Sequence, residues 1–129
     1  MQRLFVSVIL VVLGSLAAHA ASVPGVVGTS TVNGEQILVN AAGLSLYTYD
    51  VDKNGVSACY NGCAKAWPAV LVTAAEAQTL EAPFSTTTRT DGTLQLRYNN
   101  DPLYLYAGDE SPGDVNGDGL GGVWHLIVE

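Results

Sequence analysis

The stretch Tyr47-Thr48-Tyr49-Asp50-Val51-Asp52 returns 57 residues later as Tyr104-Leu105-Tyr106-Ala107-Gly108-Asp109. The same interval separates Trp67 from Trp124, so two tyrosines, an acid and a tryptophan recur without insertion or deletion. A fixed period with aromatic and acidic residues at matching positions is typical of a duplicated supersecondary unit. The duplication therefore determines the fold, but it does not by itself indicate a reaction.

The residues around this motif predict strands. Residues 37–40, a turn at 41–43 and residues 44–50 are expected to form a hairpin, and residues 94–98 and 103–107 should form its second copy. Because side chains alternate along a strand, Leu46 and Leu103 should share one face and Tyr47 and Tyr104 the other. Each copy should then pass through a loop rich in Asp, Asn and Gly to a strand beginning at Trp67 or Trp124.

The predicted fold is mainly β, with two tandem pseudo-equivalent repeats at about residues 26–72 and 83–129. A three-stranded unit of fewer than about 60 residues would bury little core alone, so one domain over residues 21–129 is expected. We expect a small sandwich or a partly closed barrel. Residues 22–30 are interpreted as a flexible lead-in, residues 73–80 as a short helix and residues 81–91 as a polar connector.

The first twenty residues resemble a secretory signal. Arg3 precedes an apolar run over residues 4–16, and Ala18-His19-Ala20 follows, which predicts cleavage after Ala20. The apolar run is shorter than the roughly 17–25 residues of a membrane-spanning helix, so a retained anchor is the less favoured interpretation. We expect a mature protein with no membrane span, located in the periplasm or secreted.

The mature chain would be strongly acidic. Without Arg3, four basic residues accompany twelve acidic ones, a formal charge of −8. So few Lys and Arg residues argue against binding nucleic acid or anionic membranes and are compatible with binding a cation.

The two cysteines, Cys59 and Cys63, are four residues apart in a chain expected to be exported. An even count in an oxidising compartment predicts a structural disulfide, and this spacing suits a helical turn. A redox-active pair is the alternative. It is less favoured because three residues intervene in a β context and the second copy has no cysteine.

The repeated Tyr-x-Tyr-x-x-Asp pattern, the segment 59–68 with its two cysteines and Trp67-Pro68, and the segment 112–124 ending in Trp124 occur together. The combination resembles a bacterial family of secreted repeats, described as predicted lipoproteins with a conserved Yx(FWY)xxD motif. The resemblance extends over about residues 34–128 and implies an exported bacterial protein without indicating a biochemical role. A lipoprotein needs a cysteine at its new N-terminus, and here the cleavage region holds only Ala, His and Ser, so a free protein is expected.

The motif residues allow two interpretations. Tyr47, Tyr49, Tyr104 and Tyr106 could stack a flat ligand such as a sugar or haem. They could instead pack against Trp67 and Trp124, with hydroxyls donating to Asp52 and Asp109, since a buried tyrosine hydroxyl needs a partner. The preservation of the whole set in both copies favours the packing interpretation.

Two acidic loops resemble the opening of a calcium loop. Residues 50–55 and residues 114–119 both place Asp, Asp or Asn, and Asn or Asp at alternate positions before a glycine, so Asp114, Asn116 and Asp118 are candidate calcium ligands. Neither loop has a glutamate at position twelve, where Asn61 and His125 stand. Ordinary turns rich in Asp, Asn and Gly are the alternative.

The sequence thus predicts an exported, non-enzymatic binding or structural module of the cell envelope. Its partner would be an envelope protein or a small ligand, and no cofactor is expected other than possible calcium. The alternative is a small periplasmic redox or electron-transfer accessory that uses the cysteine pair or the aromatic face. The mature chain has one histidine, His125, which gives little support to a transition-metal site or a hydrolase triad.

Overall fold

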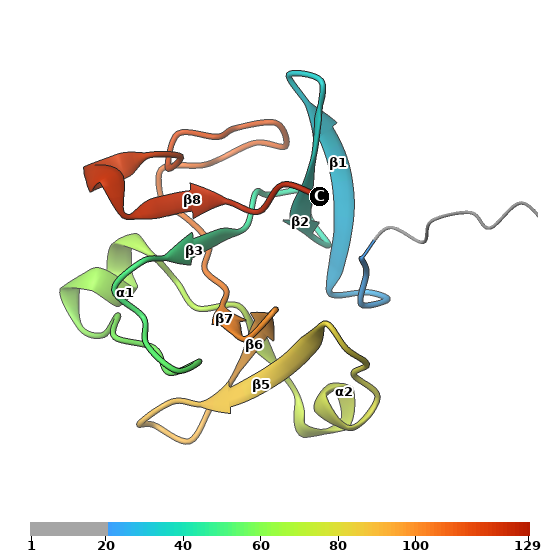
Figure 1. Ribbon diagram of the computed structural model, residues 1–129, viewed down its shortest axis with the longest axis vertical. Helices are drawn as coiled ribbons and strands as arrows, with labels where there is room; N and C mark the ends of the chain where they lie inside the picture. The colour runs from blue at the N-terminus through green and yellow to red at the C-terminus, as the bar shows by residue number, and fades with distance from the viewer. Residues whose placement is uncertain (1–20) are drawn as a thin grey trace, which may run out of the picture.

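The computed structural model describes residues 21–129 (Figure 1). The expected signal peptide of residues 1–20 lies outside the described residues. The strands are β1 (Val27–Val32), β2 (Glu35–Asn40), β3 (Tyr47–Tyr49), β4 (Leu71–Val72), β5 (Phe84–Thr88), β6 (Leu94–Tyr98), β7 (Asp101–Pro102) and β8 (Trp124–Leu126). The helices are α1 (Gly62–Ala66), α2 (Ala74–Gln78) and the 3-10 turn η1 (Leu120–Gly122). None of the helices in residues 21–129 is long and apolar enough to cross a bilayer.

Each copy begins with a hairpin. β1 pairs antiparallel with β2, with Val27 opposite Asn40, and β5 pairs antiparallel with β6, with Phe84 opposite Tyr98. The expectation of a flexible lead-in and a polar connector is therefore wrong, because residues 22–30 lead into β1 and residues 81–91 contain β5. Both strands are rich in Ser and Thr, and only Val27 and Phe84 are fully buried in them, so they lack an apolar alternation.

The hairpins expected around the turns at 41–43 and 99–102 exist only next to those turns. Val39 bridges to Ser45 in the first copy, and β6 pairs with the short β7 in the second. Beyond the turn, β3 leaves its own copy and pairs with β8, Tyr47 lying opposite Leu126. β4 of the first copy pairs in the same way with β6 of the second. Figure 1 shows β3 and β8 side by side, although they belong to different copies.

The two copies meet through reciprocal backbone hydrogen bonds. The Tyr47 N–H donates to the Tyr104 carbonyl at 2.8 Å, and the Tyr104 N–H donates to the Tyr47 carbonyl at 2.9 Å. The bond from Asp50 N–H to the Val123 carbonyl has its counterpart in the bond from Ala107 N–H to the Ala66 carbonyl, both 2.8 Å. The last strand of each copy thus completes the other copy.

The fold is mainly β and built of two repeats, as expected. It consists of small sheets, β1-β2, β3-β8 and β4-β6-β5 with β7 beside β6, and within residues 21–129 none of them closes into a barrel.

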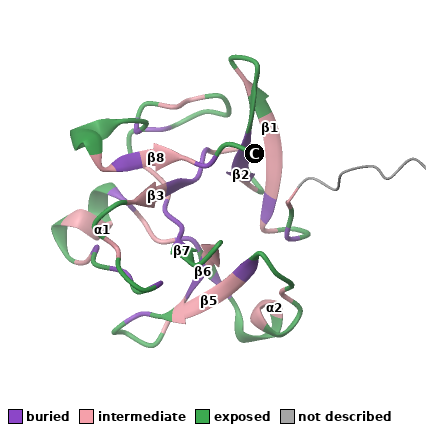
Figure 2. Ribbon diagram, in the orientation of Figure 1, coloured by how far each residue is buried: buried purple, intermediate pink, exposed green. Residues whose placement is uncertain are grey.

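Two hydrophobic clusters form the core, and Figure 2 marks the buried stretches of the chain. The aliphatic cluster includes Leu46 and Leu103, and the aromatic cluster includes Tyr47 and Tyr104, which confirms the predicted alternation. The expected short helix at residues 73–80 is also confirmed as α2. Its N-cap Thr73 accepts a hydrogen bond from the Glu76 N–H, and the Glu76 side chain accepts one from the Thr73 N–H. This capping box satisfies two backbone donors that would otherwise lack partners.

Candidate functional site

The duplicated aromatic residues form one stacked column. Tyr49 stacks on Trp124 with ring centroids 4.0 Å apart, Trp124 on Trp67 at 3.8 Å, and Trp67 on Tyr106 at 4.4 Å. Each tyrosine of the column lies on the tryptophan of the other copy. β3 and β8 bring Tyr49 and Trp124 directly opposite each other, which sets this order. We call these four residues the aromatic column.

Tyr47 and Tyr104 flank the aromatic column edge-on. Tyr47 contacts Trp67 at 5.3 Å between centroids, and Tyr104 contacts Trp124 at 5.2 Å, with ring planes almost perpendicular in both pairs. Edge-to-face packing of this kind is favourable because the positive edge of one ring meets the negative face of the other. Tyr47 and Tyr104 thus contact the tryptophan of their own copy, whereas Tyr49 and Tyr106 contact the tryptophan of the other copy. Together these contacts interlock the two copies.

The hydroxyls of Tyr47 and Tyr104 donate to acids of the opposite copy. Tyr47 donates to Asp109 Oδ2 at 2.5 Å, and Tyr104 donates to Asp52 Oδ2 at 2.7 Å. The second oxygen of each acid binds its own loop: Asp52 Oδ1 accepts from the Ala58 N–H and Asp109 Oδ1 from the Asn116 N–H. Each acid therefore holds its own loop in place and fastens the other copy.

Burial perturbs the ionisation of these groups. Tyr47 and Tyr104 are completely buried, and this burial, together with the hydrogen bond to a carboxylate, raises the pKa of both phenols well above its ordinary value. Burial also raises the pKa of Asp52, although the hydrogen bonds from Tyr104 and Ala58 oppose that shift. Both tyrosines thus remain protonated donors in the folded protein.

The geometry bears on the two interpretations of the motif. Trp67 and Trp124 are each only 6% exposed, and their faces are covered by other rings of the aromatic column. A flat ligand therefore has no free tryptophan face on which to stack. Tyr49 and Tyr106, at the two ends, are half-buried. The packing interpretation accounts for all eight motif residues.

Sequence reasoning missed a buried polar network beside Tyr104. Arg89 is 8% exposed and donates to Ser57 Oγ, to Gln95 Oε1 and to the Cys59 carbonyl, at 3.0, 2.8 and 2.7 Å. Ser57 Oγ is 2.6 Å from the Tyr104 hydroxyl, so the network reaches Asp52 through Tyr104. No local pattern marks Arg89, because its partners come from two separate segments, residues 57–59 and β6.

Gly117 was also missed, and it faces the other copy's tyrosine. A Cβ atom at this position would lie 2.7 Å from the Trp67 ring and 2.9 Å from the Tyr47 ring, which are closer than real contacts. The Gly117 N–H donates to the Tyr47 hydroxyl at 3.2 Å. Nothing in the sequence marks this contact except that Gly117 is the fourth residue of the acidic loop at 114–119, whose predicted turn glycine is Gly119.

The predicted disulfide is present and links Cys59 to Cys63, with Cα atoms 5.2 Å apart. Cys63 lies in α1, whereas Cys59 precedes the helix, so the bridge does not follow a helical turn. Cys59 is fully buried in the aromatic cluster, next to Trp67. The bridge therefore joins α1 to the aromatic cluster beside Trp67.

The candidate calcium ligands have separate partners. Asp114 Oδ2 accepts from the backbone N–H groups of residues 110 and 111, the Asn116 amide donates to the Gly108 carbonyl, and Asp118 Oδ1 accepts from the Leu126 N–H. In the other loop, Asp50 lies 2.8 Å from His125 at the surface. Within residues 21–129, no three His, Cys, Asp or Glu side chains are grouped to hold a metal ion. Calcium binding is untested, and the contacts of these side chains favour the alternative, an ordinary turn rich in Asp, Asn and Gly.

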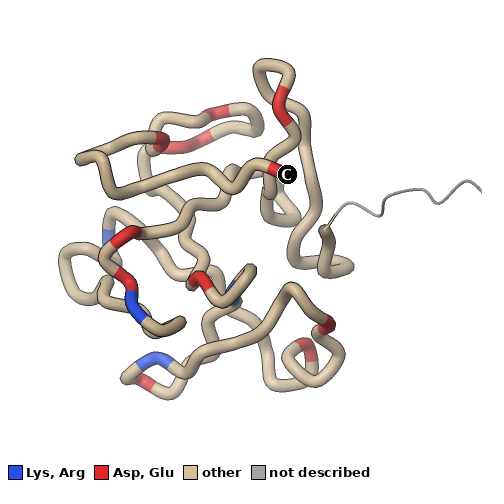
Figure 3. The backbone as a smooth tube through the Cα atoms, in the orientation of Figure 1, with Lys and Arg blue, Asp and Glu red and all other residues tan. Residues whose placement is uncertain are grey.

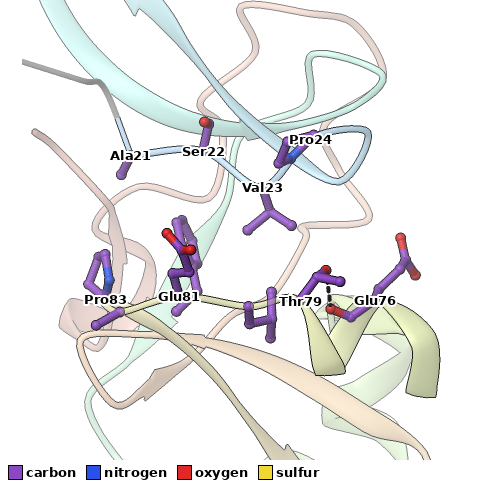
Figure 4. Close-up of a pocket in the computed structure, with 11 residues that line it drawn as sticks. Ala21, Ser22, Val23, Pro24, Glu76, Thr79, Glu81 and Pro83 are labelled. Carbon is purple, nitrogen blue, oxygen red and sulfur yellow. Dashed lines mark hydrogen bonds between the residues drawn. The ribbon is translucent and has the colours of Figure 1, made fainter.

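A cavity of about 580 Å³ lies away from the motif, between residues 21–24 and the connection from α2 to β5 (Figure 4). Its apolar lining includes Val23, Leu80 and Phe84, and two carboxylates, Glu76 and Glu81, also border it. None of the described residues that line it is Lys, Arg, His or Cys. Acidic residues outnumber basic ones over the rest of the chain as well (Figure 3).

The fold and the motif together define a mainly β protein of two interlocked repeats whose motif residues bind each other. The chain matches the model of the family Lipoprotein_15, described as a secreted repeat of unknown function, at residues 28–71 and again at residues 85–127. The chain belongs to this family of secreted repeats. Comparison with curated proteins and with solved structures finds no match.

Proposed function

We propose that this protein is an exported, non-enzymatic module of the cell envelope, acting in the periplasm or outside the cell, that binds a small ligand on a rigid two-repeat scaffold. One observation carries the proposal: the motif's tyrosine hydroxyls and acids bind one another across the two copies. Within residues 21–129, no buried side-chain nitrogen or oxygen lacks a hydrogen-bond partner. The motif thus serves stability, and binding is assigned to the surface.

The cavity between residues 21–24 and α2 supports the binding role. Its volume falls within the roughly 300–1,000 Å³ of small-molecule sites, and its lining combines apolar side chains with a few polar groups. Part of its lining comes from α2 and the connection between the two copies, which lies outside the duplicated motif. Changes in these residues can therefore alter the ligand specificity of the cavity without disturbing the core.

The charge of the cavity favours one class of ligand. Glu76 uses Oε1 to accept the Thr73 N–H, while Glu81 is exposed and available. Apolar contacts from Val23, Leu80 and Phe84 together with a carboxylate favour a ligand with an apolar body and a positively charged group. We propose an amphiphilic amine as the ligand class.

Thermal unfolding with hexylammonium as the probe tests this function. Binding to the folded state alone at a hundred times the dissociation constant would stabilise the protein by about 2.7 kcal/mol. We expect a rise in melting temperature for the wild type and for Glu35→Gln, an exposed control on β2, and a smaller rise for Glu81→Gln. Equal rises in all three proteins, or no rise in the wild type, would contradict binding in the cavity. Native mass spectrometry of protein isolated from the cell envelope would then identify the natural ligand.

A further inference from the structure

We propose that the aromatic column, with Tyr47 and Tyr104 beside it, accepts one-electron oxidation at its ends and stores it as a neutral tyrosyl radical in the core. This activity goes beyond the proposed ligand binding, because it belongs to the interlocked motif and not to the cavity. Its co-reactant is an outer-sphere one-electron oxidant, such as a metal complex or a small inorganic radical.

The stacking of the central tryptophan pair of the aromatic column favours the loss of an electron. Trp67 and Trp124 lie with centroids 3.8 Å apart and ring planes 2° apart, a close parallel stack. Removing one electron lets the positive charge spread over both stacked indoles, which stabilises the oxidised pair relative to a single oxidised indole.

The ends of the aromatic column provide access. Tyr49 and Tyr106 are half-buried, whereas the two tryptophans are 6% exposed. The three successive contacts of 4.0, 3.8 and 4.4 Å connect these ends without a gap. An oxidant in solution can therefore take an electron at either end of the aromatic column. The resulting electron hole can reach the buried indoles while the oxidant stays outside.

The flanking tyrosines supply both the last electron and a defined route for the proton. The oxidised indole pair takes one electron from Tyr47, whose O–H bond breaks as a new O–H bond forms on Asp109 Oδ2, 2.5 Å away. The products are a neutral tyrosyl radical, a neutral Asp109 carboxylic acid and a restored aromatic column, and the external oxidant is reduced by one electron. Tyr104 and Asp52 repeat the step in the other half at 2.7 Å.

Burial makes the carboxylate the proton's destination. Tyr47 and Tyr104 are fully buried, so water does not reach the hydroxyls, and burial already holds the pKa of each phenol high. The proton moves only along an existing hydrogen bond and stays beside the radical. It can therefore return when a reductant supplies the electron.

Flash photolysis of the exported protein with ruthenium(III) tris-bipyridine as the oxidant tests this relay. In the wild type, transient absorption should show an indole radical that converts to a neutral tyrosyl radical, and electron paramagnetic resonance should detect the latter. In the Tyr47→Phe/Tyr104→Phe protein the indole radical should persist. Conversion in Asp52→Asn/Asp109→Asn should slow by about tenfold or more, corresponding to about 1.4 kcal/mol on the barrier. Asp91→Asn, at an exposed acid outside the motif, should behave as the wild type.

Two results would overturn the relay. One is a tyrosyl radical formed at the same rate in all these variants, which would place it on Tyr60, Tyr98 or the ends of the aromatic column. The other is an unchanged conversion rate for wild type that has been unfolded and refolded in deuterated water, which places deuterium on the buried hydroxyls, since the proposed step moves the phenol proton. The second measurement needs no variant, so it decides the question even if the acid double variant does not fold.

Discussion

The crossed hydrogen bonds predict which residues are energetically coupled. In double-mutant cycles, Tyr47→Phe should couple to Asp109→Asn, and Tyr104→Phe to Asp52→Asn, because these pairs bind each other across the copies. The pairs within one copy, Tyr47 with Asp52 and Tyr104 with Asp109, should show no coupling. The two residues of each of these pairs share no hydrogen bond, and in both pairs they are five residues apart (52 − 47 and 109 − 104). These pairs contain the same four residues and therefore serve as matched controls.

The magnitudes follow from the partners that each change removes. A hydrogen bond to a charged group contributes about 1.5–3 kcal/mol, so we expect a coupling of that size for Tyr47 with Asp109, which is only 6% exposed. For Tyr104 with Asp52, which is half-buried, we expect about 1–2 kcal/mol, because solvent screens the interaction. The pairs within one copy should be additive within about 0.5 kcal/mol.

Urea unfolding followed by tryptophan fluorescence, with the disulfide intact, measures these energies. The slope of unfolding free energy against urea should stay constant across the variants, which would show that the native and unfolded states keep their compactness. A larger coupling within a copy than between copies would refute the interlocked arrangement. It would mean that each repeat closes on itself.

Three further predictions concern ionisation, the bridge and calcium. Burial holds the pKa of Tyr47 and Tyr104 above the ordinary value of about 10, so their contribution to stability is complete below pH about 10 and is lost as the pH rises through the folded pKa. An absorbance titration should show these two of the six tyrosines ionising only when the protein unfolds. Ionisation of all six in one reversible step would contradict this. Replacing Cys59 and Cys63 together by alanine should lower the unfolding free energy by about 2–3 kcal/mol, since a disulfide that closes so short a loop stabilises by about 2 kcal/mol and Cys59 is also buried. An unchanged urea midpoint would show that the bridge does not contribute to stability. Calcium at about 1–10 mM, a range suited to weak extracellular sites, should leave the melting temperature the same as in the presence of a chelator. The reason is that the Asp114 carboxylate already accepts hydrogen bonds from two backbone N–H groups. A rise in melting temperature that Asp114→Ala abolishes would establish a calcium site.

Local sequence patterns predicted the contents of the core and missed its connections. The alternation of side chains from Leu46 into β3 correctly separates the aliphatic cluster, with Leu46, from the aromatic cluster, with Tyr47. The same alternation arises whether a tyrosine meets the acid of its own copy or of the other. The partner is decided by long-range pairing of β3 with β8, for which a period of 57 residues carries no signal.

The elements that sequence reasoning missed depend on tertiary contacts. β5 is the segment Phe-Ser-Thr-Thr-Thr, whose residues after Phe84 carry no apolar alternation, and it is held by its register with β6. Arg89 is buried because Ser57, 32 residues earlier in the chain, and Gln95, across the turn that leads into β6, converge on it. The acidic loop after Asp109 matches a calcium loop and a backbone-capping turn equally well, since both place carboxylate oxygens at alternate positions.

The exchange of strands between the copies has an evolutionary consequence. A chain with one copy would leave β3 without β8 and the motif tyrosine without its acid. Two such chains could supply each other with both, as an isologous dimer with the same surface used twice. The present protein corresponds to that dimer joined end to end by the connection that contains α2. Fusion replaces an association that depends on protein concentration by an internal one, with an effective concentration on the order of millimolar. For a secreted protein, which is diluted once it leaves the cell, the joined form keeps its partner.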